Sequence, residues 1–249
     1  MPILTCEFCG KEMPTKTAYG VTVPIPCQCE GAVAERERLD LEEKRQNWKA
    51  AYVEALSRTG IPEGHMVHRQ WGDGDSVYLY GEQGRGKTEM AFGALRKWIK
   101  DGIRPYEEGS KRFYSSNSGK YVYMPELMMQ IRSAYEVRGV TEEDVIDAMG
   151  GVGMLVMDDL GTGKVTDWVI EKVKTILDMR YRRRDRLKTI LTTQYDLERL
   201  CSIFGSVTDS DTAIAIRSRI EGMCRIMHIQ GVDMRVNNSG YVDNGTQVL

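Results

Sequence analysis

Short apolar runs alternate with amphipathic stretches along most of the chain. A short apolar run bounded by turn residues is typical of a buried strand, whereas apolar residues that recur every three or four positions indicate a helix. Helical spacing is clearest at residues 88–100 and 126–135. This alternation predicts an α/β fold, in which a parallel sheet carries helices on both faces. The expected strands lie at residues 76–80, 121–124, 153–157, 187–193 and 224–229.

The first fifty residues depart from this pattern. Residues 31–49 mix acidic and basic side chains on strong helix formers, which is typical of a solvated helix or connector. Residues 105–120 are rich in turn formers and are predicted to be a flexible loop. The predicted parts of the chain are a cysteine-containing module at 1–30, a charged helical connector at 31–50, a main domain at 51–235 and a flexible tail at 236–249.

Four of the six cysteines lie near the start of the chain, as the pairs Cys6/Cys9 and Cys27/Cys29. Two close pairs across a short loop supply four thiolates, which fill the tetrahedral shell of a structural Zn²⁺. A segment this small has little core of its own, so the metal would supply its folding free energy. The alternative is four reduced thiols in an unstructured arm. Zinc is favoured because only two more cysteines occur in the rest of the chain.

Composition limits the class of protein. Hydrophobic residues make up 41% of the 249 residues and charged residues 28%, which excludes wholesale disorder. No apolar run approaches the ~18 residues of a spanning helix, so no membrane contact is expected. The N-terminal residues lack the pattern of a signal peptide, and we therefore expect a cytoplasmic protein. The formal net charge of −2 gives no reason by itself to expect nucleic-acid binding.

The strand expected at 76–80 leads directly into GEQGRGKT, which matches G-x-x-x-x-G-K-[ST] in full. Glycines let backbone N–H groups approach phosphate oxygens closely, and the N-terminus of the following helix adds partial positive charge. Lys87 is predicted to reach the β- and γ-phosphates of ATP, and the Thr88 hydroxyl to bind Mg²⁺. The predicted nucleotide-binding residues are Gly81, Glu82, Gln83, Gly84, Arg85, Gly86, Lys87, Thr88 and Glu89.

A phosphate loop needs an acidic site on a neighbouring strand. One apolar run ends in Asp158 and Asp159. Asp158 is predicted to hold Mg²⁺, directly or through water, and Asp159 to orient the attacking water. The plainer alternative is that the two acids cap the turn that follows. Gln194 ends another strand-like run, where ligands of parallel sheets bind, and is predicted to sense the γ-phosphate or to position water.

Basic residues gather at two places. Residues 180–188 form a cationic strip around Tyr181, which suits phosphate contacts and base stacking. The alternative is a solvated helix end, where cations complement the helix dipole. A second candidate lies in the stretch IRSAYEVRG. The candidate DNA-binding residues are Arg132, Tyr135, Arg138, Arg182, Arg183 and Arg184.

These motifs, in this order, resemble the DnaC/DnaI-type bacterial helicase loaders. The resemblance is carried by GEQGRGKT, LVMDDLG, TDW, TILTTQ, SRI and VDMR, and it extends from about residue 55 to residue 235. Such loaders belong to the initiator clade of AAA+ ATPases, have the IstB transposition ATPases as relatives, and occur in many phages and prophages. The resemblance implies an AAA+ P-loop core with little or no lid, a helicase-binding N-terminal module that is often a zinc domain, and a single-strand-binding insertion between the two nucleotide motifs.

The resemblance also implies roles for individual residues. Arg219 of SRI matches the arginine finger, which acts on the nucleotide of a neighbouring subunit, with Arg217 as the alternative. Gln194 holds the sensor 1 position, where Asn is common, and Asp159 stands where many relatives have Glu. Arg235 of VDMR lies near the sensor 2 position. The predicted catalytic residues are Lys87, Asp159, Gln194 and Arg219.

The expected function is that of an ATPase with slow hydrolysis that loads a replicative helicase of the DnaB hexamer type onto single-stranded DNA. The expected cofactors are ATP, Mg²⁺ and Zn²⁺, and self-association is expected through the arginine finger. Two alternatives are an IstB-like transposition ATPase and an ATP-dependent binding module with little hydrolysis. A metabolic P-loop kinase is less favoured, because it would need an acceptor site and a lid that no sequence feature supplies.

Overall fold

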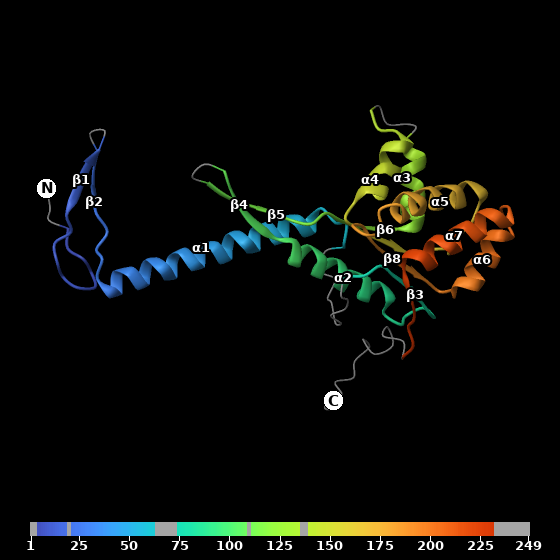
Figure 1. Ribbon diagram of the computed structural model, residues 1–249, viewed down its shortest axis with the longest axis horizontal. Helices are drawn as coiled ribbons and strands as arrows, with labels where there is room; N and C mark the ends of the chain where they lie inside the picture. The colour runs from blue at the N-terminus through green and yellow to red at the C-terminus, as the bar shows by residue number, and fades with distance from the viewer. Residues whose placement is uncertain (1–3, 19–20, 63–73, 109–110, 135–138, 232–249) are drawn as a thin grey trace. The chain divides into compact units, whose positions relative to one another are not determined.

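The computed structural model describes residues 4–18, 21–62, 74–108, 111–134 and 139–231. The chain divides into two units, Met1–Ala51 and Tyr52–Leu249. The first unit contains the two cysteine pairs, and the second contains the large sheet (Figure 1). In the described part of the chain, no helix combines the length and the apolar character needed to cross a bilayer.

The first unit has a hairpin and most of a long helix. β1 (Thr15–Ala18) pairs with β2 (Val21–Pro24) in antiparallel register. The helix α1 (Glu30–Ser57) continues beyond the predicted connector, which ended at residue 50. Charged side chains one turn apart form exposed pairs along α1, such as Arg38 with Glu35, and such pairs contribute about 0.2–1 kcal/mol each. α1 is therefore a largely exposed, charged helix.

Five strands form the parallel sheet of the second unit. They pair in the order β6-β7-β8-β3-β9, and each neighbouring pair is parallel. The predicted five-stranded parallel sheet is thus confirmed. Because all five strands run the same way, their carboxyl ends meet at one edge of the sheet, where ligands of such folds bind. The strands are β3 (Val77–Tyr80), β6 (Gly119–Tyr123), β7 (Met154–Asp158), β8 (Lys188–Thr193) and β9 (Arg225–His228).

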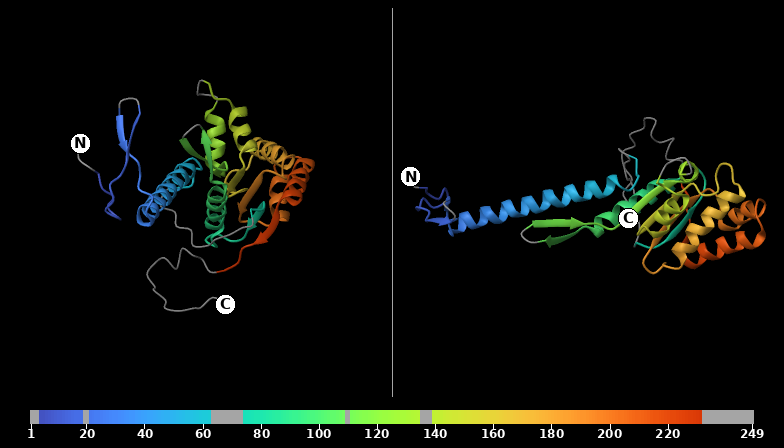
Figure 2. Two further views of the ribbon diagram at one scale, coloured as in Figure 1. Left: turned by 60° about the vertical axis from the view of Figure 1, so that its left-hand side comes forward. Right: turned by 90° about the horizontal axis from the view of Figure 1, so that it is seen from above.

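Helices surround this sheet, as Figure 2 shows, and the predicted α/β class is confirmed. α2 packs against β6, β7 and β8. Leu155 and Met157 of β7 share a buried apolar cluster with residues of α3, α5, α6 and α7. All five residues of β7 are buried, which matches the continuous apolar run that predicted this strand. The helices are α2 (Lys87–Gly102), α3 (Met124–Ser133), α4 (Glu142–Gly151), α5 (Asp167–Tyr181), α6 (Leu197–Gly205) and α7 (Ser210–Met223).

The flexible loop predicted at 105–120 is wrong over most of its length. β4 (Arg104–Glu108) and β5 (Lys111–Ser115) form an antiparallel hairpin there. Tyr106 lies opposite Phe113, and their rings stack with centroids 5.4 Å apart. Cross-strand aromatic pairs of this kind stabilise a hairpin. The glycine and serines of this stretch suggested a loop, and they obscured the alternation of aromatic and charged residues that forms the two strands.

Two helices follow from local signals near the second nucleotide motif. α3 begins two residues earlier than predicted, because Pro125 in its first turn has the fixed backbone angle that starts a helix. α4 begins at a capping box, in which Thr141 and Asp144 bond each other's backbone N–H groups. The predicted DNA contacts Tyr135 and Arg138, the sensor 2 candidate Arg235 and the tail at 236–249 lie outside the described residues.

Candidate nucleotide and metal sites

The phosphate loop connects β3 to α2 at the carboxyl edge of the sheet. Its three glycines, Gly81, Gly84 and Gly86, all occupy conformations that other residues rarely adopt. Gly86 has φ of 80° immediately before α2. Gly81 has φ of 146°, and an added Cβ there would lie 2.4 Å from the Ile229 carbonyl oxygen. Glycine at these positions therefore allows both the tight turn and the close approach of β9.

The ammonium group of Lys87 lies inside this loop. Its Nζ donates hydrogen bonds to the carbonyl oxygens of Gly81 and Glu82, each at 2.7 Å. Lys87 is only 7% exposed, so its charge is already partly removed from water. A phosphate oxygen that replaced these neutral acceptors would form a stronger bond, because it carries a negative charge opposite the ammonium. The lysine is thus held at the place where the motif predicts phosphate binding.

Asp158 meets the start of α2 across the sheet edge. Thr88 Oγ1 lies 3.0 Å from Asp158 Oδ1 and 3.2 Å from Oδ2, as donor in a shared hydrogen bond. Hydroxyl and carboxylate oxygens are the hard ligands that Mg²⁺ prefers, and it takes one or two carboxylates besides nucleotide phosphates. These two side chains therefore fit the predicted Mg²⁺ site.

Two further hydroxyls fix the Asp158 carboxylate. Thr192 Oγ1 donates to Asp158 Oδ1, and Tyr121 Oη donates to Asp158 Oδ2 at 3.0 Å. Burial raises the pKa of Asp158 above its ordinary value, while the hydroxyls of Thr192, Tyr121 and Thr88 act in the opposite direction. Burial, followed by the Asp158 charge, also raises the pKa of Tyr121, so its hydroxyl keeps its proton.

Asp159 has a left-handed backbone with φ of 67°, alone among the described non-glycine residues. Short polar residues such as Asp tolerate this conformation best. Its N–H donates to Thr192 Oγ1 at 3.0 Å, and its carbonyl oxygen accepts a bond of 2.7 Å from the Thr162 hydroxyl. Thr192 at the end of β8 and Thr162 in the loop after Asp159 therefore fix the backbone turn at Asp159.

Gln194 directly follows β8, and Asp158 ends β7. Both lie at the carboxyl edge that also carries the phosphate loop. The topology therefore brings Lys87, Thr88, Asp158, Asp159 and Gln194 to one edge of the sheet.

The arginine-finger candidates lie toward the other edge. α7 leads into the amino end of β9, and Arg219 is in its last turns. Arg219 Nε donates to Asp178 Oδ1 at 2.7 Å, and its guanidinium lies 4.8 Å from the centre of the Tyr181 ring. Arg217 forms an exposed ion pair of 2.8 Å with Glu221. Neither arginine is therefore placed beside the phosphate loop of its own chain.

The cationic strip is smaller than its sequence suggests. Arg180 is fully buried, and all three guanidinium nitrogens donate to neighbours. Nη1 binds the Met149 and Val152 carbonyl oxygens at 2.8 Å, Nη2 binds that of Lys188 at 2.6 Å, and Nε binds Thr189 Oγ1 at 2.8 Å. This arginine joins α5 to the amino ends of β7 and β8, and it cannot contact DNA.

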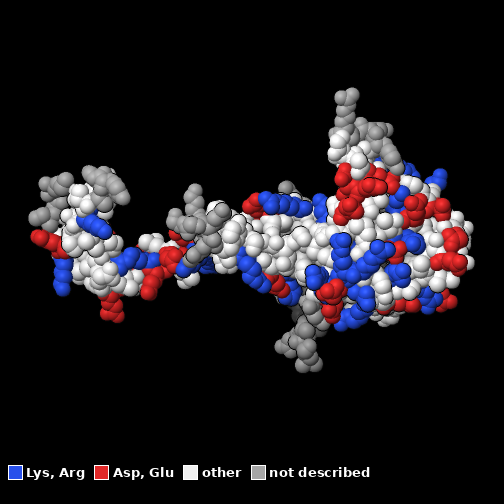
Figure 3. All heavy atoms as spheres, turned by 45° about the horizontal axis from the view of Figure 1, so that its top comes forward, with Lys and Arg blue, Asp and Glu red and all other residues white. Residues whose placement is uncertain are grey.

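The exposed part of the strip is the turn after α5, at Arg182, Arg183, Arg184 and Arg186. Arg184 lies 4.4 Å from the centre of the Tyr181 ring. Figure 3 shows basic and acidic side chains gathered in separate patches on the second unit, so a net charge of −2 averages over both. The basic turn remains available to an anionic partner.

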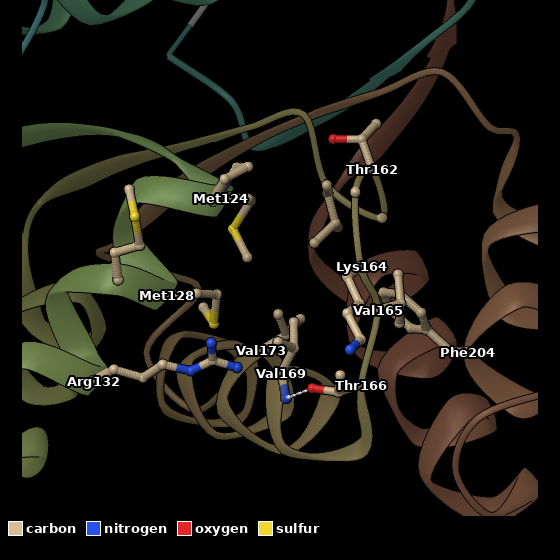
Figure 4. A pocket seen from close by; sticks show the side chains of 15 residues that line it. Met124, Met128, Arg132, Thr162, Lys164, Val165, Thr166, Val169, Val173 and Phe204 are labelled. Carbon is tan, nitrogen blue, oxygen red and sulfur yellow. Dashed lines mark hydrogen bonds between the residues drawn. The ribbon is translucent and has the colours of Figure 1, made fainter.

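A cavity of about 280 Å³ lies between α3, α5 and the loop that follows Asp159. Figure 4 shows Arg132 extending from α3 along its floor toward Thr166 and Val169. The Arg132 guanidinium also lies 4.8 Å from the centre of the Trp168 ring. The apolar lining of the cavity includes Met124, Met128, Leu160, Val165, Val173 and Phe204.

The four N-terminal cysteines form one cluster. Cys6 and Cys29 sulfurs are 3.7 Å apart, Cys9 and Cys27 sulfurs are 3.6 Å apart, and all four lie within 4.8 Å of one another. Four thiolates at ~2.3 Å from Zn²⁺ would be ~3.8 Å apart at the corners of a tetrahedron. Backbone N–H groups of Phe8 and Cys9 lower the pKa of Cys6 to about 7, which favours its thiolate, whereas burial and the neighbouring thiols raise the pKa of Cys9 to about 11. The cluster is compatible with zinc.

Comparison with known proteins supports the motif-based resemblance. No family model matches the chain. It is 26% identical over 134 residues to the replicative helicase loader DnaI of Bacillus subtilis, covering 53% of this chain and 37% of DnaI. The chain resembles the DnaC/DnaI-type helicase loaders. It is also 27% identical over 173 residues to the uncharacterized protein YqaM of the same organism, covering 66% of this chain and 46% of YqaM. The chain thus spans less than half the length of both curated relatives.

Solved structures of replication proteins are also similar. The crystal structure of DnaI has a TM-score of 0.48 at 21% identity, covering 67% of this chain and 78% of that one. The crystal structure of the DnaC helicase loader has a TM-score of 0.46 at 24% identity, covering 64% and 80%. AMPPCP-bound DnaA from Aquifex aeolicus has a TM-score of 0.45 at 18% identity, covering 65% and 42%.

Sequence reasoning missed three features of the site. Thr192 and Tyr121 were assigned only to strands, although a polar side chain within a buried apolar run is a signal that it has a partner. The structural role of Arg180 was also missed, since a run of basic residues resembles a uniform surface strip. The cavity had no sequence signal, because its lining comes from α3, α5, α6 and a loop.

Proposed function

We propose that this chain is a DnaC/DnaI-like AAA+ ATPase that binds a hexameric replicative helicase and places it on single-stranded DNA. The observation that carries the proposal is the meeting of Thr88 with Asp158 beside the buried Lys87. A phosphate loop and a metal-binding acid that meet at one sheet edge form a nucleoside triphosphate site. The sequence similarity to DnaI supports replication as its setting.

Each residue at this edge has a separate role toward the nucleotide. Lys87 exchanges its two carbonyl partners for β- and γ-phosphate oxygens. Thr88 and Asp158 hold Mg²⁺, which supplies positive charge against the phosphates. Asp159 orients water toward the γ-phosphate, and Gln194 binds the γ-phosphate or that water. The backbone of Asp159 is already fixed by Thr192, so this acid needs little rearrangement to act.

Arg219 completes the site of a second copy. It lies toward the amino edge of its own sheet, whereas its own phosphate loop lies at the carboxyl edge. Its Nε is bonded to Asp178, which leaves the two Nη groups at the end of a side chain that is 34% exposed. This geometry suits an arginine finger that acts between subunits. It favours Arg219 over Arg217, because Arg217 forms an exposed ion pair with Glu221.

The cysteine cluster supports a partner-binding role for the first unit. A zinc-held knuckle can form a stable surface without a large core. Large apolar side chains are exposed on this unit, and clusters of this kind mark protein interaction sites. We assign this surface to the helicase. The exposed apolar residues before α1 are Leu4, Phe8, Val21, Val23 and Ile25, and Leu39 and Leu41 of α1 are exposed in the same unit.

Single-stranded DNA is assigned to the basic residues of the second unit. Arg182, Arg183 and Arg184 form an exposed cationic turn, and Arg132 lies on a different element beside Trp168. Cations neutralise phosphates, and an aromatic ring can stack on a base. Tyr135 and Arg138 remain predictions of the sequence alone.

The test combines nucleotide binding with helicase loading. Lys87→Ala in the full chain should weaken the binding of a fluorescent ATP analogue at least ~10-fold, because a hydrogen bond to a charged group contributes about 1.5–3 kcal/mol. It should also abolish ATP-dependent transfer of the purified replicative helicase onto single-stranded DNA. The matched control is Lys97→Ala on the same helix, where Lys97 forms an exposed pair with Asp101.

Two outcomes would contradict the proposal. Unchanged nucleotide affinity in Lys87→Ala would remove the phosphate-loop assignment. Specific binding of a purified transposase, with no binding of the helicase, would replace helicase loading by a transposition function.

A further inference from the structure

Tyr121 contacts three parts of the second unit, one of which, the segment that follows α1, has no role in the proposed function. Its hydroxyl donates to Asp158 Oδ2 at 3.0 Å, and its backbone N–H donates to the Thr59 carbonyl oxygen at 2.7 Å. Its ring packs edge-on against Phe92 of α2, with centroids 4.8 Å apart. One strand residue therefore joins the metal-binding acid, the helix after the phosphate loop and the segment that follows α1.

Two of the contacts of Asp158 hold its carboxylate so that the remaining face is turned toward Thr88. A carboxylate has about four acceptor positions on its two oxygens. Thr192 takes one on Oδ1 and Tyr121 takes one on Oδ2. The positions that remain include those facing Thr88, which is 3.0 Å and 3.2 Å from the two oxygens. Tyr121 and Thr192 thus set the rotation of the carboxylate so that it faces the metal position.

The segment after α1 is attached tightly to the same residue. Thr59 is 1% exposed, and its N–H and its hydroxyl both donate to the Leu56 carbonyl oxygen, at 2.9 Å and 2.7 Å. Gly60 follows with φ of 82°, and an added Cβ there would lie 3.0 Å from the Tyr121 carbonyl oxygen. The backbone of residues 59–60 therefore lies directly against β6 at Tyr121, and a shift of one requires a shift of the other.

We propose that Tyr121 is a positioning residue for Asp158, and that it couples the metal site to the segment that follows α1. The inference rests on the proposed nucleotide site and adds a regulatory connection to it. Residues that orient a metal ligand through a hydrogen bond typically change metal affinity 10- to 100-fold when they are removed. The ring of Tyr121 makes its packing contacts without the hydroxyl, so the two contributions can be separated.

The first test is Tyr121→Phe in the full chain. Binding of a fluorescent ATP analogue is measured in EDTA and across a Mg²⁺ titration, and direct Mn²⁺ binding is measured by electron paramagnetic resonance. We expect half-saturation by Mg²⁺ to move on the order of 10-fold upward, with nucleotide affinity in EDTA unchanged. The matched control is Tyr106→Phe, since Tyr106 is exposed on the β4–β5 hairpin and should leave both values unchanged.

The outcomes separate this inference from the proposed function. Wild-type protein that binds no ATP analogue would remove both. If Mg²⁺ promotes nucleotide binding by the wild type, and Tyr121→Phe reaches half-saturation at the same Mg²⁺ concentration, the positioning role alone would be overturned. A loss of nucleotide affinity in EDTA that accompanies the Mg²⁺ shift would also overturn it, because that result indicates general distortion of the site.

The second test uses the wild-type chain and does not depend on a variant that folds. Amide hydrogen exchange is followed at Tyr121 and Ile61 with ATP alone and with ATP plus Mg²⁺. Ile61 N–H bonds to Thr59 Oγ1 at 3.3 Å, so it reports on the turn after α1. We expect both amides to exchange more slowly when Mg²⁺ is added. Slower exchange in the phosphate loop with no change at either amide would overturn the coupling.

Discussion

Thr88 Oγ1 lies 3.0 Å from Asp158 Oδ1, although 70 positions separate the two residues in the chain. The contact forms because the strands before each residue run parallel and end at the same sheet edge. It joins the phosphate loop to the acid that is predicted to bind Mg²⁺, and it is the geometric basis of the proposed nucleotide site. Four predictions test the site and the units around it.

The first prediction concerns the charge of Asp158. Burial raises the pKa of Asp158 in the folded state, so ionisation of Asp158 lowers the free energy of unfolding. The contribution of the protonated form to stability is fully present below the ordinary pKa of ~3.9, and it is lost as pH rises through the folded pKa. Asp158→Asn should therefore raise the free energy of unfolding at neutral pH and approach the wild type in acid. Urea denaturation from pH 3 to pH 8 measures this, with the exposed Asp101→Asn as control. A variant less stable than wild type at pH 7 would refute it. The same variant should lose Mg²⁺ dependence of nucleotide binding.

The second prediction concerns zinc. Purified protein should contain about one Zn²⁺ per chain by mass spectrometry, because four sulfurs stand at tetrahedral separations. Cys6→Ser should lose most of the metal and the helicase interaction, while ATP binding by the second unit persists. Cys201→Ser is the control, since Cys201 lies in α6 and donates to the Ala213 carbonyl oxygen. Full zinc content in Cys6→Ser would show that the cluster is not the metal site.

The third prediction concerns the buried Arg180. Arg180→Leu should lower the free energy of unfolding by about 3 kcal/mol or more, because it leaves buried carbonyl and hydroxyl groups without a donor. Arg182→Leu, two positions away on the exposed turn, should stay within about 0.5 kcal/mol of wild type. Denaturant unfolding compares them. Similar stabilities for the two variants would contradict the structural role of Arg180.

The fourth prediction concerns action between subunits. Arg219→Ala and Lys87→Ala should each lack ATPase activity alone, the first for want of the finger and the second for want of the phosphate contact. An equimolar mixture should regain part of the activity, because Arg219 of the Lys87 variant can serve the intact loop of the Arg219 variant. Substitution of Arg217→Ala should leave activity near wild type. Full activity of Arg219→Ala by itself would rule out the finger.

Local sequence patterns predicted the strands, the phosphate loop and the paired acids, because each depends on residues close in the chain. The glycines of GEQGRGKT fix their own turn, and the apolar run before Asp158 needs burial on both faces. These features do not require knowledge of which strands pair.

Prediction of the hydrogen-bond partners of Asp158 requires knowledge of which strands pair. Thr192 and Tyr121 lie on the two strands that flank β7, and the order β6-β7-β8 appears only in the folded sheet. Arg180 resembled its exposed neighbours, because its burial depends on carbonyl groups of α4 and β8. The hairpin at 104–115 was missed because its turn residues outweighed its alternating pattern. Long-range pairing therefore accounts for most of what sequence patterns left out.

The placement of Lys87 and Arg219 toward opposite edges of one sheet constrains any assembly of this chain. With Arg219 as the proposed finger, each copy would offer an arginine at one edge of its sheet and a phosphate loop at the other, so the proposed contacts would be head-to-tail rather than symmetric between two identical faces. An open row of such copies always has one fewer complete site than it has subunits. Turnover per subunit should therefore rise with the length of the row, and it reaches its full value only when the row closes into a ring.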